Sequence, residues 1–188
     1  MARRANFIND YGKAKPEQRV RMIFLNYQAF PDIIAGYEQK IIIRIMDELN
    51  RAHRDEIGDL GVRVQGGGMP SSPTERIGIA EVTIEAAIRA NYLPEYLLVE
   101  TETDDDHVRV TNILYMMRRD FKSVEASIKM FGGRDAAILK DALKGVPMMD
   151  IGDKVNMSEH YVRNMVSQMK ADVREQLANE YRNKKWEA

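Results

Sequence analysis

Polar side chains that can hydrogen-bond to base edges lie close together near the carboxyl end of the sequence. Arg163 can donate two hydrogen bonds to guanine, Asn164 can pair with the edge of adenine, and Glu159 can accept a hydrogen bond from the amino group of cytosine. Lysine and arginine side chains nearby can contact phosphates. The residues that we predict to contact DNA are Lys154, Ser158, Glu159, His160, Arg163, Asn164, Ser167, Lys170 and Arg174.

The residues from Met148 to Lys170 have the pattern of a helix-turn-helix that would position these side chains. Gly152 allows two helices to cross closely, Asn156 tolerates the positive φ of a turn, and Ser158 can cap the second helix. Apolar residues at the expected spacing would seal the pair: Ile151, Val155, Met157, Val162 and Met165. We therefore expect the second helix to enter the major groove of double-stranded promoter DNA.

The apolar pattern of the second helix continues well beyond the length that DNA recognition needs. It includes Val166, Met169, Val173, Leu177 and Tyr181. Another part of the same chain, the amino-terminal helices, could cover this stripe, or a second copy of the chain could do so. A homodimer would bind two half-sites and gain affinity.

The rest of the sequence predicts an all-α fold with two helical regions joined by a linker. Apolar residues from Pro16 to Ile57 recur at helical spacing, and Pro31 divides them into two helices. The run Ile41 to Ile43 would also suit a strand, but the helical spacing continues past it. We predict an amino-terminal helical hairpin at 1–60, a Gly/Ser/Pro-rich flexible linker at 61–76, and a helical domain at 77–188 that contains the helix-turn-helix at 148–170.

Acidic and glycine residues predict where the helices of the carboxyl-terminal domain begin and end. We expect a helix that opens at Thr74 and ends between Ala90 and Tyr92, a short helix from Leu93 to Val99, a long helix from Asp104 to the pair Gly132-Gly133, and a helix from Arg134 to Lys144. Gly145 lies where a left-handed residue commonly ends a helix.

Three consecutive aspartates, Asp104 to Asp106, precede His107 and raise the question of a metal site. Carboxylates at the start of a helix interact favourably with the positive end of its dipole. Consecutive helical residues point in different directions and so cannot converge on one metal ion. Helix capping is therefore the preferred explanation, and we predict no bound metal. The glycines at 66–68 lack the Gly-Lys-Ser/Thr continuation of a phosphate-binding loop, so we predict no cofactor.

The sequence gives no pattern of catalytic residues. It contains no cysteine, and His53, His107 and His160 have no recognised catalytic spacing, so we expect solvated surface histidines and a protein that is not an enzyme. The absence of cysteine also excludes disulfides and is compatible with a cytoplasmic location.

Composition and charge place limits on the partners. Hydrophobic residues make up 44% and charged residues 30% of the chain, as in ordinary folded proteins, and no apolar run reaches membrane-spanning length. The formal net charge is −1, so any attraction to DNA has to come from local basic groups. One such group lies near the amino terminus: Arg3, Arg4, Lys13, Lys15, Arg19 and Arg21.

Two segments of the sequence resemble a known family. Residues Asp135 to Gly145 and Asp150 to Arg163 are similar to phage and prophage late-gene regulators of the ArpU and RinA type, whose carboxyl-terminal region is similar to sigma-70 region 4. The resemblance implies transcription regulation through promoter DNA, with RNA polymerase as a further partner.

A phage DNA-packaging protein of the small-terminase type is the alternative function. Such proteins also join a helix-turn-helix to oligomerising helices. A ring of many subunits would favour packaging, whereas a monomer or dimer would favour regulation.

Overall fold

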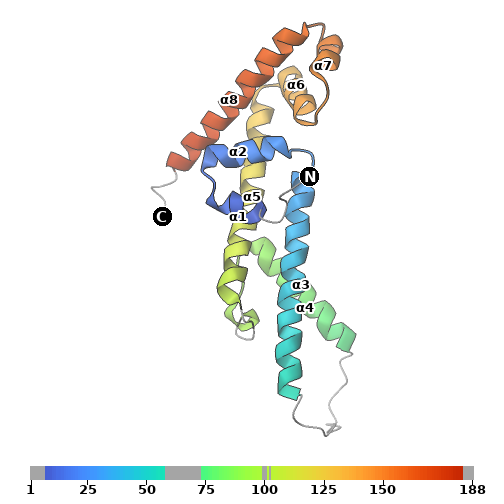
Figure 1. The fold of residues 1–188 in the computed structure, drawn as a ribbon, viewed down its shortest axis with the longest axis vertical. Coiled ribbons are helices and arrows are strands. Elements are labelled where there is room, and N and C mark those ends of the chain that lie inside the picture. Colours follow the sequence, from blue (N-terminus) through green and yellow to red (C-terminus); the bar gives the residue numbers. More distant parts are fainter. Residues whose placement is uncertain (1–6, 58–72, 99–100, 102, 184–188) are drawn as a thin grey trace. The chain divides into compact units, whose positions relative to one another are not determined.

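Helices form almost all of the chain that the structure describes, which is residues 7–57, 73–98, 101 and 103–183 of a computed structural model (Figure 1). The elements are α1 (Phe7–Lys13), α2 (Pro16–Leu25), α3 (Phe30–Ile57), α4 (Pro73–Ala90), the 3₁₀-helix η1 (Glu95–Leu97), α5 (Asp104–Met130), α6 (Gly133–Leu143), α7 (Met148–Val155) and α8 (Glu159–Asn183). Within these described ranges there is no strand, so the predicted all-α fold is confirmed.

Most helix boundaries follow the predictions. Pro31 lies in the first turn of α3, where its fixed φ suits a helix start, and the isoleucine run at 41–43 is helical. The predicted linker at 61–76 is shorter at its end, because α4 begins at Pro73; residues 61–72 lie outside the described part. The short helix predicted at 93–99 is wrong in extent: of the described residues there, Glu95–Leu97 form the 3₁₀ turn η1, between Pro94 and Leu98.

The described residues form two compact units. The terminal unit combines those at 1–33 with those at 116–188, and the central unit contains those at 34–115. These units cut across the predicted ranges 1–60 and 77–188, and those domain boundaries stay a prediction.

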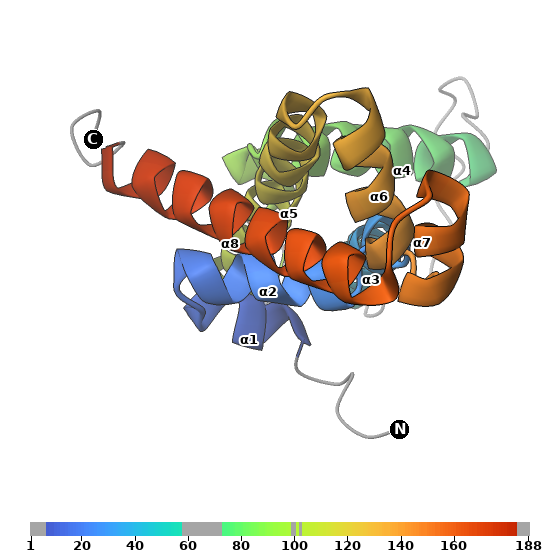
Figure 2. The same cartoon turned by 90° about the horizontal axis from the view of Figure 1, so that it is seen from above.

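In the terminal unit, α8 packs along α2, α6 and α7 (Figure 2). The apolar stripe of α8 is buried by these contacts at Val162, Val166, Met169, Val173 and Leu177. Of the two predicted covers for this stripe, the structure therefore has the amino-terminal helix of the same chain. The stripe is not available to a second copy.

Aromatic rings join α1 and α3 to α5 inside the terminal unit. Phe30 is fully buried and lies with its ring centroid 5.8 Å from that of Tyr11 and 5.5 Å from that of Phe121. Offset and tilted ring pairs at these distances add to the stabilisation from buried area. They fix the amino-terminal helices on the second half of α5.

A buried carboxylate, Asp120 of α5, lies at the centre of the same unit. The Tyr11 hydroxyl donates a hydrogen bond to it at 3.0 Å, and Arg19 Nε lies 2.8 Å from Asp120 Oδ2 in an ion pair that lacks the alignment of a hydrogen bond. The guanidinium groups of Arg19 and Arg119 lie 4.8 Å and 5.1 Å from the ring centroid of Tyr181 in α8. Arg19, one of the basic residues counted near the amino terminus, is therefore an internal residue that is not available to a partner.

A second buried polar cluster connects α3 and α5 in the central unit. His107 Nε2 lies 3.0 Å from Glu48 Oε2, and the Thr103 hydroxyl donates to Glu48 Oε1 at 2.8 Å. Arg44 adds ion pairs to Glu48 and to Asp106. The prediction of a solvated surface histidine is wrong for His107, which is 1% exposed because Glu48 and Thr103 supply hydrogen-bond partners inside the unit.

Candidate nucleic-acid interface

Local backbone preferences create a tight helical corner in the terminal unit, which we define as α7, the turn at 156–158 and the first turns of α8. Gly145 ends α6 with φ of 85°, and the extended Pro147 starts α7. Asn156 ends α7 in the left-handed conformation, with φ of 55° and ψ of 48°, as its residue type predicts. The three residues Asn156 to Ser158 then connect α7 to α8, which begins at Glu159.

Gly152 is the point of closest approach within this corner. Its carbonyl accepts a hydrogen bond from the Met157 amide at 2.9 Å, and a Cβ atom at this position would lie 2.6 Å from the Met157 carbonyl oxygen. Backbone atoms cannot move aside as a flexible side chain can. The corner therefore requires glycine, as the sequence predicts.

Capping and burial hold the first turns of α8 in place. Ser158 Oγ accepts a hydrogen bond from the Tyr161 amide at 3.3 Å, which is the predicted N-cap contact. Ile151 and Val162 are buried, while the other predicted sealing residues, Val155, Met157 and Met165, are partly exposed. Arg134 of α6 donates to the Val155 carbonyl at 2.6 Å and so supports the end of α7.

Five of the residues predicted to contact DNA face solvent on the first three turns of α8. We call this set the recognition face: Glu159, His160, Arg163, Asn164 and Ser167, all of them exposed. Side chains one helical turn apart are paired on it. Arg163 Nη2 donates to Glu159 Oε1, and Asn164 Nδ2 lies 3.0 Å from His160 Nε2.

The three predicted phosphate-contacting residues differ in accessibility. Lys154 is exposed but forms an ion pair with Asp141 of α6, with Nζ and Oδ2 3.2 Å apart. Lys170 and Arg174 are partly buried, and Arg174 Nε donates to the Lys170 carbonyl at 3.1 Å. Burial, with the charge of Arg174, lowers the pKa of Lys170. Phosphate contacts by these residues stay a prediction.

The sequence prediction omitted one exposed aromatic side chain, Tyr161, which is 56% exposed in the first turn of α8. Tyr161 lies three residues from both Ser158 and Asn164, so helical spacing could have placed it beside the recognition face. A phenol at this position can contact a thymine methyl group or a phosphate.

The acidic start of α5 behaves as a helix cap. The Asp105 amide donates to Asp104 Oδ1 at 2.8 Å, and Asp106 is paired with Arg44 and Arg109. Within the ranges that the structure describes, no group of three or more acidic, histidine or cysteine side chains is arranged to hold a metal ion.

The Glu48, Thr103 and His107 cluster lacks the arrangement of a catalytic triad. Thr103 Oγ1 and Glu48 Oε2 both approach the same ring nitrogen of His107, Nε2, at 3.2 Å and 3.0 Å. A nucleophile and an orienting carboxylate would contact opposite nitrogens of the imidazole. The cluster is therefore best explained as a structural contact between α3 and α5.

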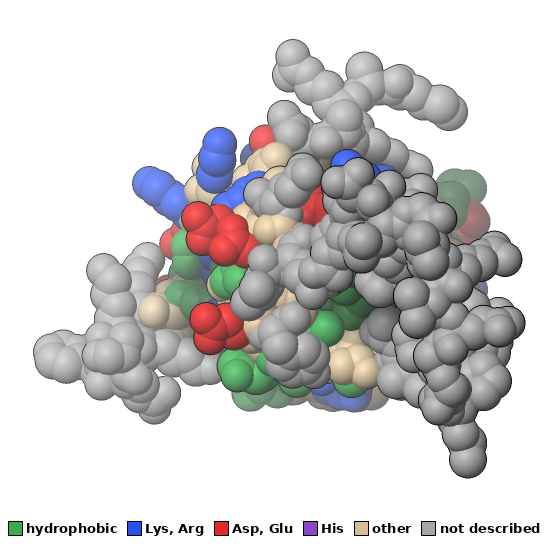
Figure 3. Space-filling view, turned by 90° about the horizontal axis from the view of Figure 1, so that it is seen from below, with side chains coloured by type: hydrophobic (Ala, Val, Ile, Leu, Met, Phe, Trp, Pro, Cys, Tyr) green, Lys and Arg blue, Asp and Glu red, His purple; other side chains and the backbone are tan. Residues whose placement is uncertain are grey.

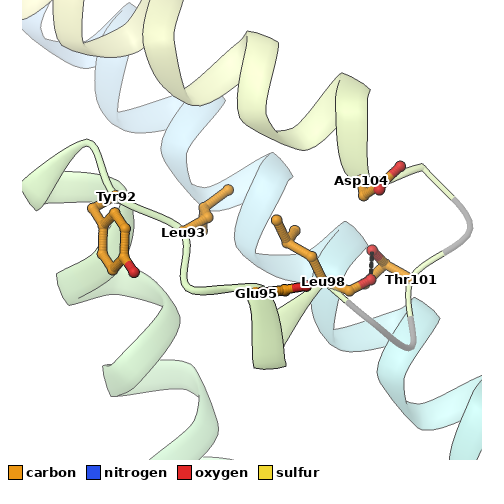
Figure 4. A pocket seen from close by; sticks show the side chains of 6 residues that line it. All are labelled: Tyr92, Leu93, Glu95, Leu98, Thr101 and Asp104. Atoms are coloured by element: carbon orange, nitrogen blue, oxygen red, sulfur yellow. Dashed lines mark hydrogen bonds between the residues drawn. The ribbon is translucent and has the colours of Figure 1, made fainter.

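A pocket in the central unit lies between the end of α4, η1 and the start of α5 (Figure 4). Leu93 and Leu98 point toward each other across it, and Glu95 and Asp104 supply its acidic groups. The Thr101 hydroxyl donates to the Leu98 carbonyl at 2.8 Å, which leaves it poorly available to a ligand.

On the face shown in Figure 3, described acidic, basic and hydrophobic side chains are interspersed.

Comparison with known proteins gives no match to a protein family, to a curated protein or to a solved structure. No helix in the described ranges has the length and apolar character needed to cross a membrane.

Proposed function

We propose that the protein is a sequence-specific DNA-binding regulator of transcription whose recognition face contacts the major groove of promoter DNA. One observation carries the proposal. Five exposed polar side chains lie on the start of a helix whose orientation is fixed by Gly152, Asn156 and Ser158. This is the arrangement that a helix-turn-helix uses to bring side chains to base edges.

The types of residue on the recognition face support base recognition over general attraction to phosphate. Acidic and basic residues are balanced along α6, α7 and α8, so a non-specific electrostatic contribution would be small. Arg163, Asn164 and Glu159 instead carry the donors and acceptors that distinguish guanine, adenine and cytosine. Phage or prophage late genes, and contact with RNA polymerase, are proposed from the resemblance of residues 135–145 and 150–163 alone.

Burial of the α8 stripe favours regulation over a packaging role. A packaging ring needs a face for assembly, and the long apolar stripe of α8 is covered by α2, α6 and α7 of the same chain. Light scattering after size-exclusion chromatography tests this point: a monomer or dimer is expected, and a ring of many subunits would favour the packaging function.

A gel-shift titration tests DNA binding itself. Duplexes selected from a random pool by the intact protein, at a stated salt concentration, should bind more tightly than unselected duplexes. Arg163→Ala should weaken the selected complex by about 1–3 kcal/mol and leave the fold intact. The matched control is Arg51→Ala, at an exposed position on α3 outside the corner, which should leave binding unchanged. Failure of every duplex to bind at low salt would contradict the proposal.

A further inference from the structure

The recognition face carries an acidic residue, Glu159, at the position where a DNA-binding helix first meets the groove. Its carboxylate is close to the positive end of the α8 dipole, which stabilises the helix start. The interaction with the helix dipole does not explain why the Glu159 carboxylate is also paired with Arg163. Glu159 Oε1 accepts a hydrogen bond from Arg163, although both side chains are exposed, at 46% and 65%.

The contact with Glu159 leaves most of Arg163 available to a base. A guanidinium group has five N–H donors in a fixed plane, and Glu159 accepts from the Nη2 end. The remaining donors can still form two hydrogen bonds to the O6 and N7 atoms of guanine. Glu159 thus restricts the rotamers of the long arginine side chain, which lowers the entropy lost when Arg163 binds.

The pair presents donors and an acceptor side by side. The major-groove edge of a G·C pair offers the opposite pattern, with two acceptors on guanine and one amino donor on cytosine. The amino group of adenine lies beside the N7 acceptor, which would repel a carboxylate. At a base pair that offers no suitable donor, the carboxylate loses its bound water and gains no hydrogen bond in exchange, which is unfavourable.

We propose, on the basis of the proposed function, that Glu159 determines specificity: it positions Arg163 on guanine and itself accepts from cytosine, so that the pair selects a G·C base pair. The same carboxylate weakens binding to all other sequences, because it is repelled by phosphates and desolvated at a mismatched position. Glu159 therefore contributes discrimination at the expense of general affinity.

Selection from a random duplex pool followed by sequencing tests this inference with three variants. The wild-type protein should enrich a G·C pair at one position. Glu159→Gln should reduce that preference by about tenfold and bind unselected duplexes more tightly. Glu159→Asp keeps the negative charge at the helix start but is too short to hold Arg163, so it should lose the preference without gaining general affinity. Glu180→Gln removes the same charge from an exposed position late in α8 and should resemble the wild type.

The outcomes separate this inference from the proposed function. A wild-type protein that selects duplexes without a G·C preference, or a Glu159→Gln variant that retains the preference, overturns the role of Glu159 and leaves DNA recognition standing. A wild-type protein that selects no duplex overturns both. Circular dichroism of the two Glu159 variants, which should match the wild type, verifies that lost preference reflects the missing contact and not an unfolded helix.

Discussion

The terminal and central units each bury a carboxylate beside an arginine, and the two carboxylates respond in opposite ways. Asp120 is 2% exposed and Glu48 is 5% exposed. Burial raises the pKa of Asp120, and the opposing effects of Arg19, Tyr11 and Arg119 do not overcome it. Burial also raises the pKa of Glu48, but hydrogen bonds from His107 and Thr103 and the charges of His107 and Arg44 outweigh it, so that this pKa is lowered.

Depth explains the difference. Asp120 lies deeper inside its unit, where the loss of hydration is larger than the combined effect of its partners. Glu48 lies closer to the surface, where Arg44 and Thr103 donate hydrogen bonds to its Oε1 and His107 Nε2 lies 3.0 Å from its Oε2. A nearby arginine therefore does not by itself determine the charge state of a covered carboxylate.

Removal of the deeper carboxylate should have the largest effect. Asp120→Ala leaves Arg19 and the Tyr11 hydroxyl buried without their partner, and the free energy of unfolding should fall by about 3–5 kcal/mol in a urea titration. Asp172→Ala, at an exposed position of α8, should change it by less than about 0.5 kcal/mol. Equal effects of the two substitutions would show that the Asp120 cluster contributes nothing.

Glycines give the next comparison between the units. Gly152→Val in the terminal unit forces a side chain against the Met157 carbonyl and should lower the free energy of unfolding by about 1–3 kcal/mol. Gly36→Ala in the central unit meets no atom within 4 Å, lies inside α3, and should raise it by about 0.5–1 kcal/mol. Thermal unfolding of both variants measures whether each substitution lowers or raises the stability. A valine at 152 that leaves the stability unchanged would contradict the close packing of the corner.

A smaller effect is expected when the Glu48 charge is removed and its shape is kept. Glu48→Gln retains a hydrogen-bond acceptor for Thr103 and loses the ion pair with Arg44, so the free energy of unfolding should fall by about 1 kcal/mol. Urea titration of this variant and of Asp120→Ala compares how much each cluster contributes to the free energy of unfolding. A larger loss for Glu48→Gln would reverse the comparison.

Acidification should change the stability of the two units in opposite directions, with the smallest effect of the series. A hydrogen bond from Arg109 lowers the pKa of Asp106, with help from Arg44, and the pKa of Glu48 is also lowered. Their stabilisation is therefore present above the ordinary carboxyl pKa and is lost as pH falls through the lowered values. The raised pKa of Asp120 has the opposite sign, because its contribution is present at low pH and is lost as pH rises through the raised value.

Hydrogen exchange measured at several pH values tests this difference. Amides of α3 around Glu48 should lose protection on acidification before amides of α5 around Asp120. Glu48→Gln should remove part of the pH dependence of the central unit and none of that in the terminal unit. Simultaneous loss of protection in both units of the wild type would contradict the opposite signs.

Local features of the fold were predictable from the sequence, and long-range contacts were not. Gly152, Asn156 and Ser158 each have a backbone requirement that their residue type reveals, and the structure meets all three. The burial of His107, expected at the surface, and of Arg19 was not predictable because their partners, Glu48 and Asp120, lie far away in the sequence. The residues of the recognition face are exposed as helical spacing predicts, whereas their pairing into Glu159–Arg163 and His160–Asn164 depends on rotamers that spacing does not specify.

The continuity of α8 limits how the protein can be divided into fragments. One helix of 25 residues carries the recognition face on its first turns and is anchored farther along by Val173 and Leu177, against a unit that includes α2. A fragment that starts at α6 would keep the exposed side chains of the recognition face. It would lose α2, which packs against the later turns of α8. A fragment that preserves the packing of the corner therefore includes α2 together with α6, α7 and α8.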